Sequence, residues 1–157
     1  MVDIYLDTEF NGFGGRLLSM GIVVTNHSYF IGEAEEWYEV LDYSDIFHEL
    51  DPWVKDNVLP MLLERQGLSY DAFRASFIIF MQKYEGATIH VDWPSDIVHL
   101  TQLLLGRNHL ETVHIPFTIV VHDFISNDGI ESEVPHHALH DARMIRKIVE
   151  YKKLYAK

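Results

Sequence analysis

Carboxylates occur in three short clusters whose spacing suits cation binding or acid–base chemistry. In the first cluster, Asp7 and Glu9 are two residues apart in a run rich in β-branched and aromatic residues, so both should point to one face of a strand. Two ionised carboxylates about 7 Å apart on one face repel each other unless a cation lies between them. A solvent-facing strand edge would tolerate the same pair, so the pair alone leaves a metal site and a plain surface edge open.

The second cluster consists of Asp92, at the end of an expected strand, and Asp96, in the first turn of the helix that should follow. An acid in a first turn stabilises a helix by complementing its dipole. Asp92 is equally suited to cap a turn that contains Pro94. Each acid is therefore a candidate metal ligand and also a candidate structural residue.

The third cluster combines histidines with an acid at the start of a C-terminal helix that should begin near Pro135. Within a helix, His136 and Asp141 would lie about 140° apart. With His136 in a loop and Asp141 one turn inside the helix, both can face a common pocket. His136 and His140 have the spacing of two zinc ligands on a helix, so a zinc site is an alternative.

The elements that must position these clusters alternate between strands and helices. Strands are expected at 2–10, 17–25, 29–41, 88–91 and 113–124, and helices at 45–63 (interrupted by two prolines), 69–86, 96–105 and 135–155. The order predicts an α/β fold with a mixed sheet. A length of 157 residues without a linker or repeat predicts a single domain, 1–157.

Charge and composition narrow the choice of partners. With 24 acidic and 12 basic residues, the net charge is -12, which argues against a general electrostatic grip on nucleic acid. Bound divalent cations could partly neutralise such acids. Cysteine is absent, which excludes disulfides and thiolate chemistry. The N-terminus does not resemble a secretory signal and no apolar run could span a bilayer, so we expect a cytoplasmic protein without membrane contact.

The three clusters, in this order, resemble those of the DEDDh family of 3′–5′ exonucleases in the ribonuclease H-like superfamily. The matching pieces are Leu6-Asp7-Thr8-Glu9-Phe10, Asp92-Trp93-Pro94-Ser95-Asp96 and His136-His137-Ala138-Leu139-His140-Asp141-Ala142. The segment from Asp51 to Pro60 is similar to one in the short exoribonucleases of the ribonuclease T and mycobacterial type. The resemblance spans essentially the whole chain and implies a ribonuclease H-like mixed β-sheet flanked by helices, forming a single exonuclease domain.

The resemblance also implies a role for each matching residue. The four matching acids would bind two Mg²⁺ or Mn²⁺ ions, and His136 would be the general base that takes a proton from the attacking water. The acids are Asp7, Glu9, Asp96 and Asp141. Asp92 rivals Asp96, because the second motif departs from the family pattern. Phe10 resembles an aromatic that packs on the terminal base, although packing in the core is equally compatible with its position. Thr8 is a further candidate for contact with the substrate.

The implied activity is metal-dependent hydrolysis of phosphodiester bonds at the 3′ ends of single-stranded nucleic acid, with RNA favoured over DNA and nucleoside monophosphates released. A 3′–5′ exodeoxyribonuclease and an inactive nucleic-acid-binding module are alternatives. The low basic content favours the module, whereas the complete set of acids with His136 favours the enzyme. Six of the twelve basic residues lie in the last 15 positions, where they could guide a strand or complement a helix dipole. Related enzymes often dimerise, so the resemblance leaves a homodimer open, although the sequence indicates no specific interface.

Overall fold

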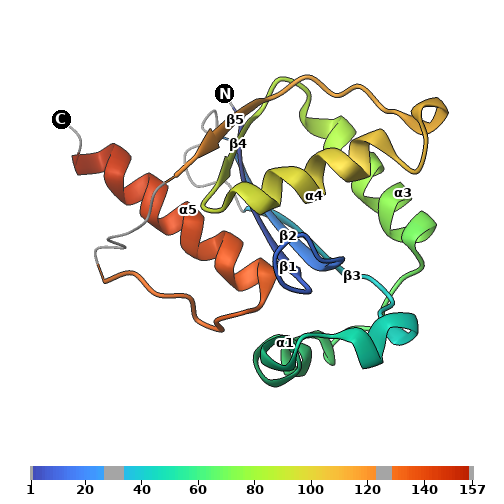
Figure 1. Cartoon of the computed structure of the whole chain (residues 1–157). Coiled ribbons are helices and arrows are strands. Elements are labelled where there is room, and N and C mark those ends of the chain that lie inside the picture. The colour runs from blue at the N-terminus through green and yellow to red at the C-terminus, as the bar shows by residue number, and fades with distance from the viewer. Residues whose placement is uncertain (1, 27–33, 123–128, 156–157) are drawn as a thin grey trace.

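Five strands form one mixed sheet in the order β3-β2-β1-β4-β5 (Figure 1). The computed structural model describes residues 2–26, 34–122 and 129–155. The strands are β1 (Val2–Phe10), β2 (Leu17–Asn26), β3 (Glu35–Val40), β4 (Thr88–Val91) and β5 (Thr118–Val121). Strands β1, β2 and β3 pair antiparallel, whereas β4 runs parallel to β1 and β5 parallel to β4. The predicted α/β class with a mixed sheet is thus confirmed.

Helices cover both faces of this sheet. They are α1 (Pro52–Asn57), α2 (Leu59–Leu62), α3 (Tyr70–Met81), α4 (Pro94–Leu105) and α5 (Ala138–Tyr155), with three short 3-10 helices, η1 (Ser44–Glu49), η2 (Gln82–Tyr84) and η3 (His109–Glu111). In Figure 1, α3 and α4 lie on one side of the sheet and α5 lies on the other. Within the described ranges, none of these helices has the length and apolar character needed to cross a bilayer.

The alternation of side chains along β1 divides the core into two layers. Ile4 and Leu6 pack in a cluster with Phe77 of α3, whereas Tyr5 packs with Ile145 of α5. Successive residues of a strand point to opposite faces, so Asp7 and Glu9 share the α5 face with Tyr5. The expectation that both acids point to one face is therefore confirmed.

Side-chain caps set the starts of two of these helices. Ser69 caps α3 by accepting a hydrogen bond from Ala72 N at 3.3 Å. Asp51 caps α1 in the same way through Trp53 N at 2.8 Å. The region expected to be a proline-interrupted helix over 45–63 is divided into η1, α1 and α2. Proline lacks the amide donor of a helix interior, so each α-helix here has its proline in the first turn.

Several predicted boundaries differ in the structure: α3 ends at Met81 and is followed by η2, and α4 already begins at Pro94. Helix α5 starts at Ala138 and not at residue 135, because His136 has a positive φ of 63° that a right-handed helix does not allow. The strand expected over 113–124 is limited to β5, and the amide of Val113 instead bonds to Leu104 O at the end of α4. The strand expected over 29–41 is described only as β3, since 27–33 lies outside the described residues. Residues 123–124 likewise lie outside them.

Candidate metal centre

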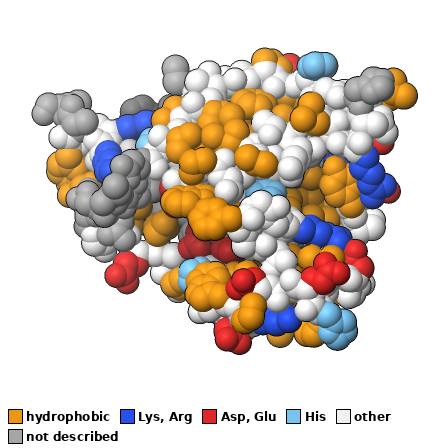
Figure 2. Space-filling model, in the orientation of Figure 1, with side chains coloured by type: hydrophobic (Ala, Val, Ile, Leu, Met, Phe, Trp, Pro, Cys, Tyr) orange, Lys and Arg blue, Asp and Glu red, His pale blue; other side chains and the backbone are white. Residues whose placement is uncertain are grey.

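Five carboxylates converge near the C-terminal end of β1. Asp7, Asp92 and Asp96 form one group and Asp7, Glu9 and Asp141 a second, each with carboxylate oxygens within 4.8 Å of one another. Asp7 belongs to both groups. Figure 2 shows acidic side chains in a recess near the middle of the face it presents, with hydrophobic side chains on both sides. The structure thus brings together all four acids that the sequence singled out, together with the rival Asp92.

Asp96 is held by hydrogen bonds that cross from the start of α4 to β1. Its Oδ1 accepts hydrogen bonds from Thr8 N at 3.1 Å and from Thr8 Oγ1 at 2.6 Å. Its Oδ2 accepts one from Trp93 N at 3.2 Å. The residue is 1% exposed, so these donors fix a carboxylate that would otherwise be costly to bury. Asp96 therefore has both a capping role and a place in the acidic cluster.

His136 and Asp141 face one cavity, as the loop-and-helix alternative predicts. The backbone N of His136 donates to Asp141 Oδ2 at 3.0 Å, which ties the loop to the first turn of α5. A cavity of about 310 Å³ is lined by both residues together with Asp7 and Asp92. The His136 ring also meets the ring of Trp53 edge-on, with centroids 4.9 Å apart. His136 thus lines the same cavity as Asp7, Asp92 and Asp141 from a position before the helix.

Gly21 permits the close approach that brings α5 to the acids. It pairs with Asp7 across β1 and β2. A Cβ atom at Gly21 would lie 2.3 Å from Leu139 N and 2.4 Å from the carbonyl carbon of Ala138, so only glycine fits beneath the start of the helix. The sequence-based predictions missed this residue. Its signal was a glycine within an otherwise apolar strand, which marks a close backbone approach.

The cluster is electrostatically costly when no cation is bound. Burial, and then the neighbouring carboxylates, raise the pKa of Asp7 well above its usual value and that of Glu9 to about 8. Burial also raises the pKa of Asp96 to about 7, although the hydrogen bond from Thr8 acts in the opposite sense. Among the described residues, the buried Oδ2 of Asp7 has no hydrogen-bond partner. An orphaned carboxylate oxygen among other acids fits a hard divalent cation, which prefers oxygen ligands.

The zinc alternative requires His136 and His140 to meet, and the structure separates them. His140 lines a different cavity, together with His137 and Arg65, and its Nδ1 lies 3.8 Å from a carboxylate oxygen of Glu133. In the described part of the chain, both groups of potential metal ligands consist of carboxylates alone. The donor set therefore suits Mg²⁺ or Mn²⁺ better than zinc.

The two residues expected to touch a substrate have different surroundings. The side chain of Thr8 is buried and bonded to Asp96, so it positions an acid, and its contact with a substrate stays a prediction. Phe10 packs against the ring of His99 with centroids 5.0 Å apart, and it also lines an open cleft of about 400 Å³ next to Glu9. Its position thus combines core packing with access to the cleft.

The basic residues of α5 are largely engaged in ion pairs within the chain. Arg143 binds Glu36 at 2.6 Å and Lys147 binds Glu133 at 2.7 Å. Since these side chains neutralise acids of the same protein, the structure does not favour the idea that they guide a nucleic-acid strand.

A scan against protein-family models and a search of curated proteins both found no match to this chain. The site is therefore interpreted from its own geometry and from the resemblance of its three motifs.

Proposed function

We propose that the protein is a metal-dependent 3′–5′ exonuclease that hydrolyses phosphodiester bonds at the ends of single-stranded nucleic acid, with RNA as the favoured substrate. The observation that carries this proposal is the pair of carboxylate groups that share Asp7 beside His136. Acids from three separate motifs meet in one recess, although they are as far apart in the chain as Glu9 and Asp141.

The fold supports the same assignment. A sheet in which β1 pairs antiparallel with β2 and parallel with β4, covered by helices on both faces, is compatible with a ribonuclease H-like fold. The acids lie at the end of β1 and at the starts of α4 and α5. Ends of parallel strands and starts of helices are common ligand sites in α/β proteins. The motif order resembles that of DEDDh exonucleases, which links this fold to this chemistry.

Each residue of the site has a distinct chemical task. Two divalent cations, when bound, would lower the pKa of an attacking water, stabilise the charge that develops at phosphorus and support the leaving alkoxide. Asp7 contributes to both ligand groups, one with Glu9 and Asp141 and the other with Asp92 and Asp96.

His136 takes the proton of the attacking water, because a neutral imidazole near pH 7 is matched to that step. Its loop position leaves the ring beside the cavity and outside the ligand set. Thr8 and the backbone of Trp93 keep Asp96 in place. The chain thereby holds the groups in position before a substrate arrives, so little reorganisation is needed during the reaction.

The test is an assay with 5′-labelled single-stranded RNA and DNA in Mg²⁺, Mn²⁺ or a chelator. Shortening from the 3′ end that needs the metal, and that stops with Asp7→Asn, is expected. Glu85→Gln is the matched control because Glu85 is an exposed acid outside the cluster, and this variant should retain full activity. The polymer that is shortened at the higher rate, RNA or DNA, identifies the preferred sugar.

Binding without shortening would refute the exonuclease and favour the inactive binding module. Equal activity of the wild type and Asp7→Asn would remove the acidic cluster from the reaction. Cleavage that yields internal fragments would leave the metal centre intact but contradict the terminal specificity.

A further inference from the structure

Trp53 is an aromatic residue near the start of α1 that the mechanism above does not use. Its ring meets the imidazole of His136 edge-on, with centroids 4.9 Å apart and planes inclined by 83°. Trp53 is 53% exposed, so much of its ring lies outside the core. Aromatic rings prefer edge-on contacts of this kind, and such a contact restricts rotation of the two rings. The contact therefore joins α1 directly to the residue proposed as the general base.

The imidazole of His136 needs an external group to fix its orientation. A general base must lie within hydrogen-bond reach of the proton it removes, and its ring is commonly oriented by a third group. Within the described residues, neither ring nitrogen of His136 has a hydrogen-bond partner. The bond from its backbone N to Asp141 fixes the loop but not the ring, because the outer side-chain torsion of histidine has only a broad, roughly two-fold preference. The orientation of the ring must thus come from packing, and Trp53 supplies that contact.

Helix α1 is a firm support for Trp53. Asp51 Oδ1 accepts a hydrogen bond from Trp53 N at 2.8 Å, and Asn57 Nδ2 donates to Trp53 O at 2.8 Å. The next residue, Val54, is 2% exposed and belongs to one hydrophobic cluster with Ala138, the first residue of α5. The helix is therefore anchored against the element that follows the loop of the general base.

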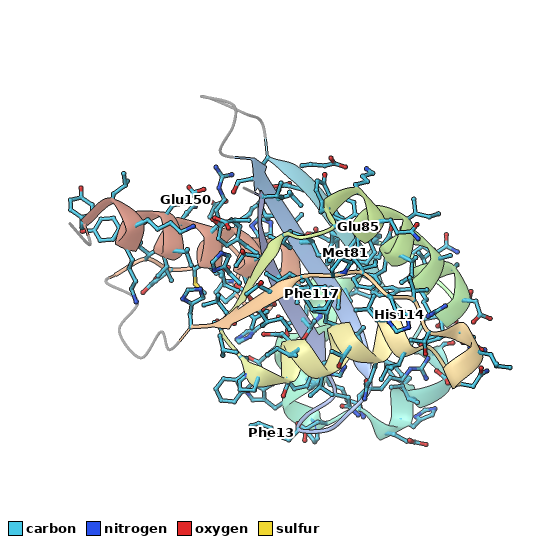
Figure 3. All side chains as sticks on the ribbon, turned by 90° about the horizontal axis from the view of Figure 1, so that it is seen from above. Phe13, Met81, Glu85, His114, Phe117 and Glu150 are labelled. Carbon is cyan, nitrogen blue, oxygen red and sulfur yellow. The ribbon has the colours of Figure 1, made fainter. Side chains whose placement is uncertain are left out.

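Side-chain hydrogen bonds also tie α1 to the strand that carries the acids. Asn11 directly follows β1, and its Oδ1 accepts a hydrogen bond from Asp51 N at 2.7 Å while its Nδ2 donates to Glu49 O at 3.3 Å. In Figure 3, Phe13 of the same turn lies at the outer edge of the molecule. These bonds attach the start of α1 to the end of β1, so Trp53 is held in a fixed relation to the acids of that strand.

We propose that Trp53 is a positioning residue that orients the His136 imidazole for removal of the proton from the attacking water. The proposal rests on the proposed function and adds a part that the acids do not supply. Trp53 acts through His136 alone, since it holds a ring in place and takes no part in proton transfer or metal binding. Loss of the Trp53 ring should therefore reduce turnover only while His136 is present.

The test is a double-mutant cycle of Trp53→Ala, His136→Ala and the protein with both changes, assayed on 5′-labelled single-stranded RNA in Mn²⁺. We expect Trp53→Ala to lower kcat by about 10- to 100-fold, the effect of a displaced catalytic group, with KM and Mn²⁺ affinity unchanged. In protein that already carries His136→Ala, Trp53→Ala should have no further effect on kcat.

Phe47→Ala is the matched control. Phe47 is a half-exposed aromatic residue of the neighbouring η1, and its ring meets that of His48 at the same interplanar angle of 83°. This variant should keep the wild-type kcat. Trp53→Phe should retain most of the activity, because a smaller aromatic ring still packs edge-on. Each variant of Trp53 keeps the backbone N that bonds to Asp51, and urea unfolding should show unchanged stability.

The outcomes separate the positioning role from the exonuclease. If wild-type protein shortens RNA and Trp53→Ala does so at the same kcat, the positioning role is wrong and the enzyme stands. A loss of kcat that is equal with and without His136 would show that Trp53 serves the fold. A KM raised in both backgrounds would show that Trp53 touches the substrate, and either result overturns the proposal. If wild-type protein shortens no strand, the proposed function fails and the positioning role fails with it.

Discussion

Two carboxylates on the same face of β1 have opposite surroundings. Asp3 is 2% exposed, and its oxygens lie 2.5 Å from Lys153 Nζ and 3.3 Å from His90 Nε2. Asp7, four residues further along, is surrounded by other carboxylates, and its Oδ2 has no hydrogen-bond partner within the described part of the chain. Both acids face α5, because residues of equal parity share a face of a strand.

The difference shows how one helix serves two purposes. The end of α5 supplies Lys153, so the buried charge of Asp3 is balanced by the protein itself. The start of α5 supplies Asp141, which adds charge of the same sign next to Asp7. A buried acid with internal counter-charges has its charge balanced by the protein itself, so that loss of either partner is costly, whereas an acidic group without them suits a cation from solution.

The largest effect should come from His136. His136→Ala should lower kcat by about 10²- to 10⁴-fold, the usual contribution of a general base, and should leave Mn²⁺ affinity unchanged because the ligand groups are carboxylates. Asp7→Ala should lose both. Calorimetric titration and rates on labelled RNA measure the two quantities. His114→Ala, which changes an exposed histidine outside both acidic groups, is the control, and a fully active His136→Ala protein would contradict the assignment.

The two aspartates of β1 should respond in opposite ways to the same substitution. Asp7→Asn should reduce activity by more than about 100-fold, since even outer partners of metal ligands contribute 10- to 100-fold. It should also stabilise the metal-free protein, because it removes repulsion. Asp3→Asn should keep activity but lower the free energy of unfolding by about 1–3 kcal/mol, as it leaves His90 and the half-exposed Lys153 without their acid. Urea unfolding measures the free energy of unfolding of both variants, and a change of the same sign in the two would contradict the comparison.

Gly21→Ala should displace the start of α5, which carries Asp141, more than its end, which carries Lys153. The new Cβ would collide with the backbone of Ala138 and Leu139, so the start of the helix, with Asp141, must shift. A displacement of about 1 Å can cost up to about 100-fold in rate, and overpacking about 1–3 kcal/mol in stability. We expect weaker Mn²⁺ binding and a lower kcat/KM. Unchanged Mn²⁺ affinity in a destabilised protein would show that Gly21 serves the fold alone.

The pH dependence of stability should depend on whether divalent cations are present. In the folded protein, the pKa values of Asp7, Glu9 and Asp96 are raised, compared with about 4 in the unfolded chain. The folded state therefore binds more protons between about pH 4 and 8, so these groups make the metal-free protein less stable as pH rises through that window.

Histidines with lowered pKa values, such as His122, lowered to about 4, act in the opposite sense, below about pH 6.5. The informative quantity is thus the difference between the melting temperatures of the wild type and of Asp7→Asn. The melting temperature of the wild type should fall further below that of the variant at pH 8 than at pH 5. Mn²⁺ at 100 times its Kd should stabilise the wild type at pH 8 by about 2.7 kcal/mol. Stabilisation by this Mn²⁺ concentration that is equal at pH 5 and pH 8, or equal in the wild type and in Asp7→Asn, would contradict a metal site at these acids.

The smallest effect concerns salt. Since Arg143, Lys147 and Lys153 are paired with acids of the chain, few phosphates should be neutralised by side chains. The plot of log affinity for single-stranded RNA against log salt, at constant Mn²⁺, should have a slope of magnitude below about 2, equivalent to fewer than about three phosphates. Arg143→Gln should leave that slope unchanged. A steep slope that Arg143→Gln reduces would restore the strand-guiding role of α5.

Much of the site was predictable because its residues carry local signals. The period of a strand predicts that Asp7 and Glu9 share a face. The signal of a helix start predicts that Asp96 lies in a first turn. The choice between Asp92 and Asp96 could not be made from the sequence, because both carboxylates approach Asp7 only once β4 and α4 are in place. The start of α5 was predicted too early, since the left-handed backbone of His136 is stabilised by a bond from its own amide to Asp141 that a local pattern does not reveal.

The residue types that suit the chemistry of the site are visible in the sequence: acids in strand and helix-start positions, one imidazole, and a period-2 pattern that puts Asp7 and Glu9 on one face. These properties depend on side-chain type and on neighbours in the chain, so they can be read locally. Only the tertiary structure decided that Asp3 meets Lys153 while Asp7 meets further acids, and that Phe13 lies against Trp93. Such contacts join segments distant in the chain, and the approach of the start of α5 to β1 depends on the space that Gly21 leaves.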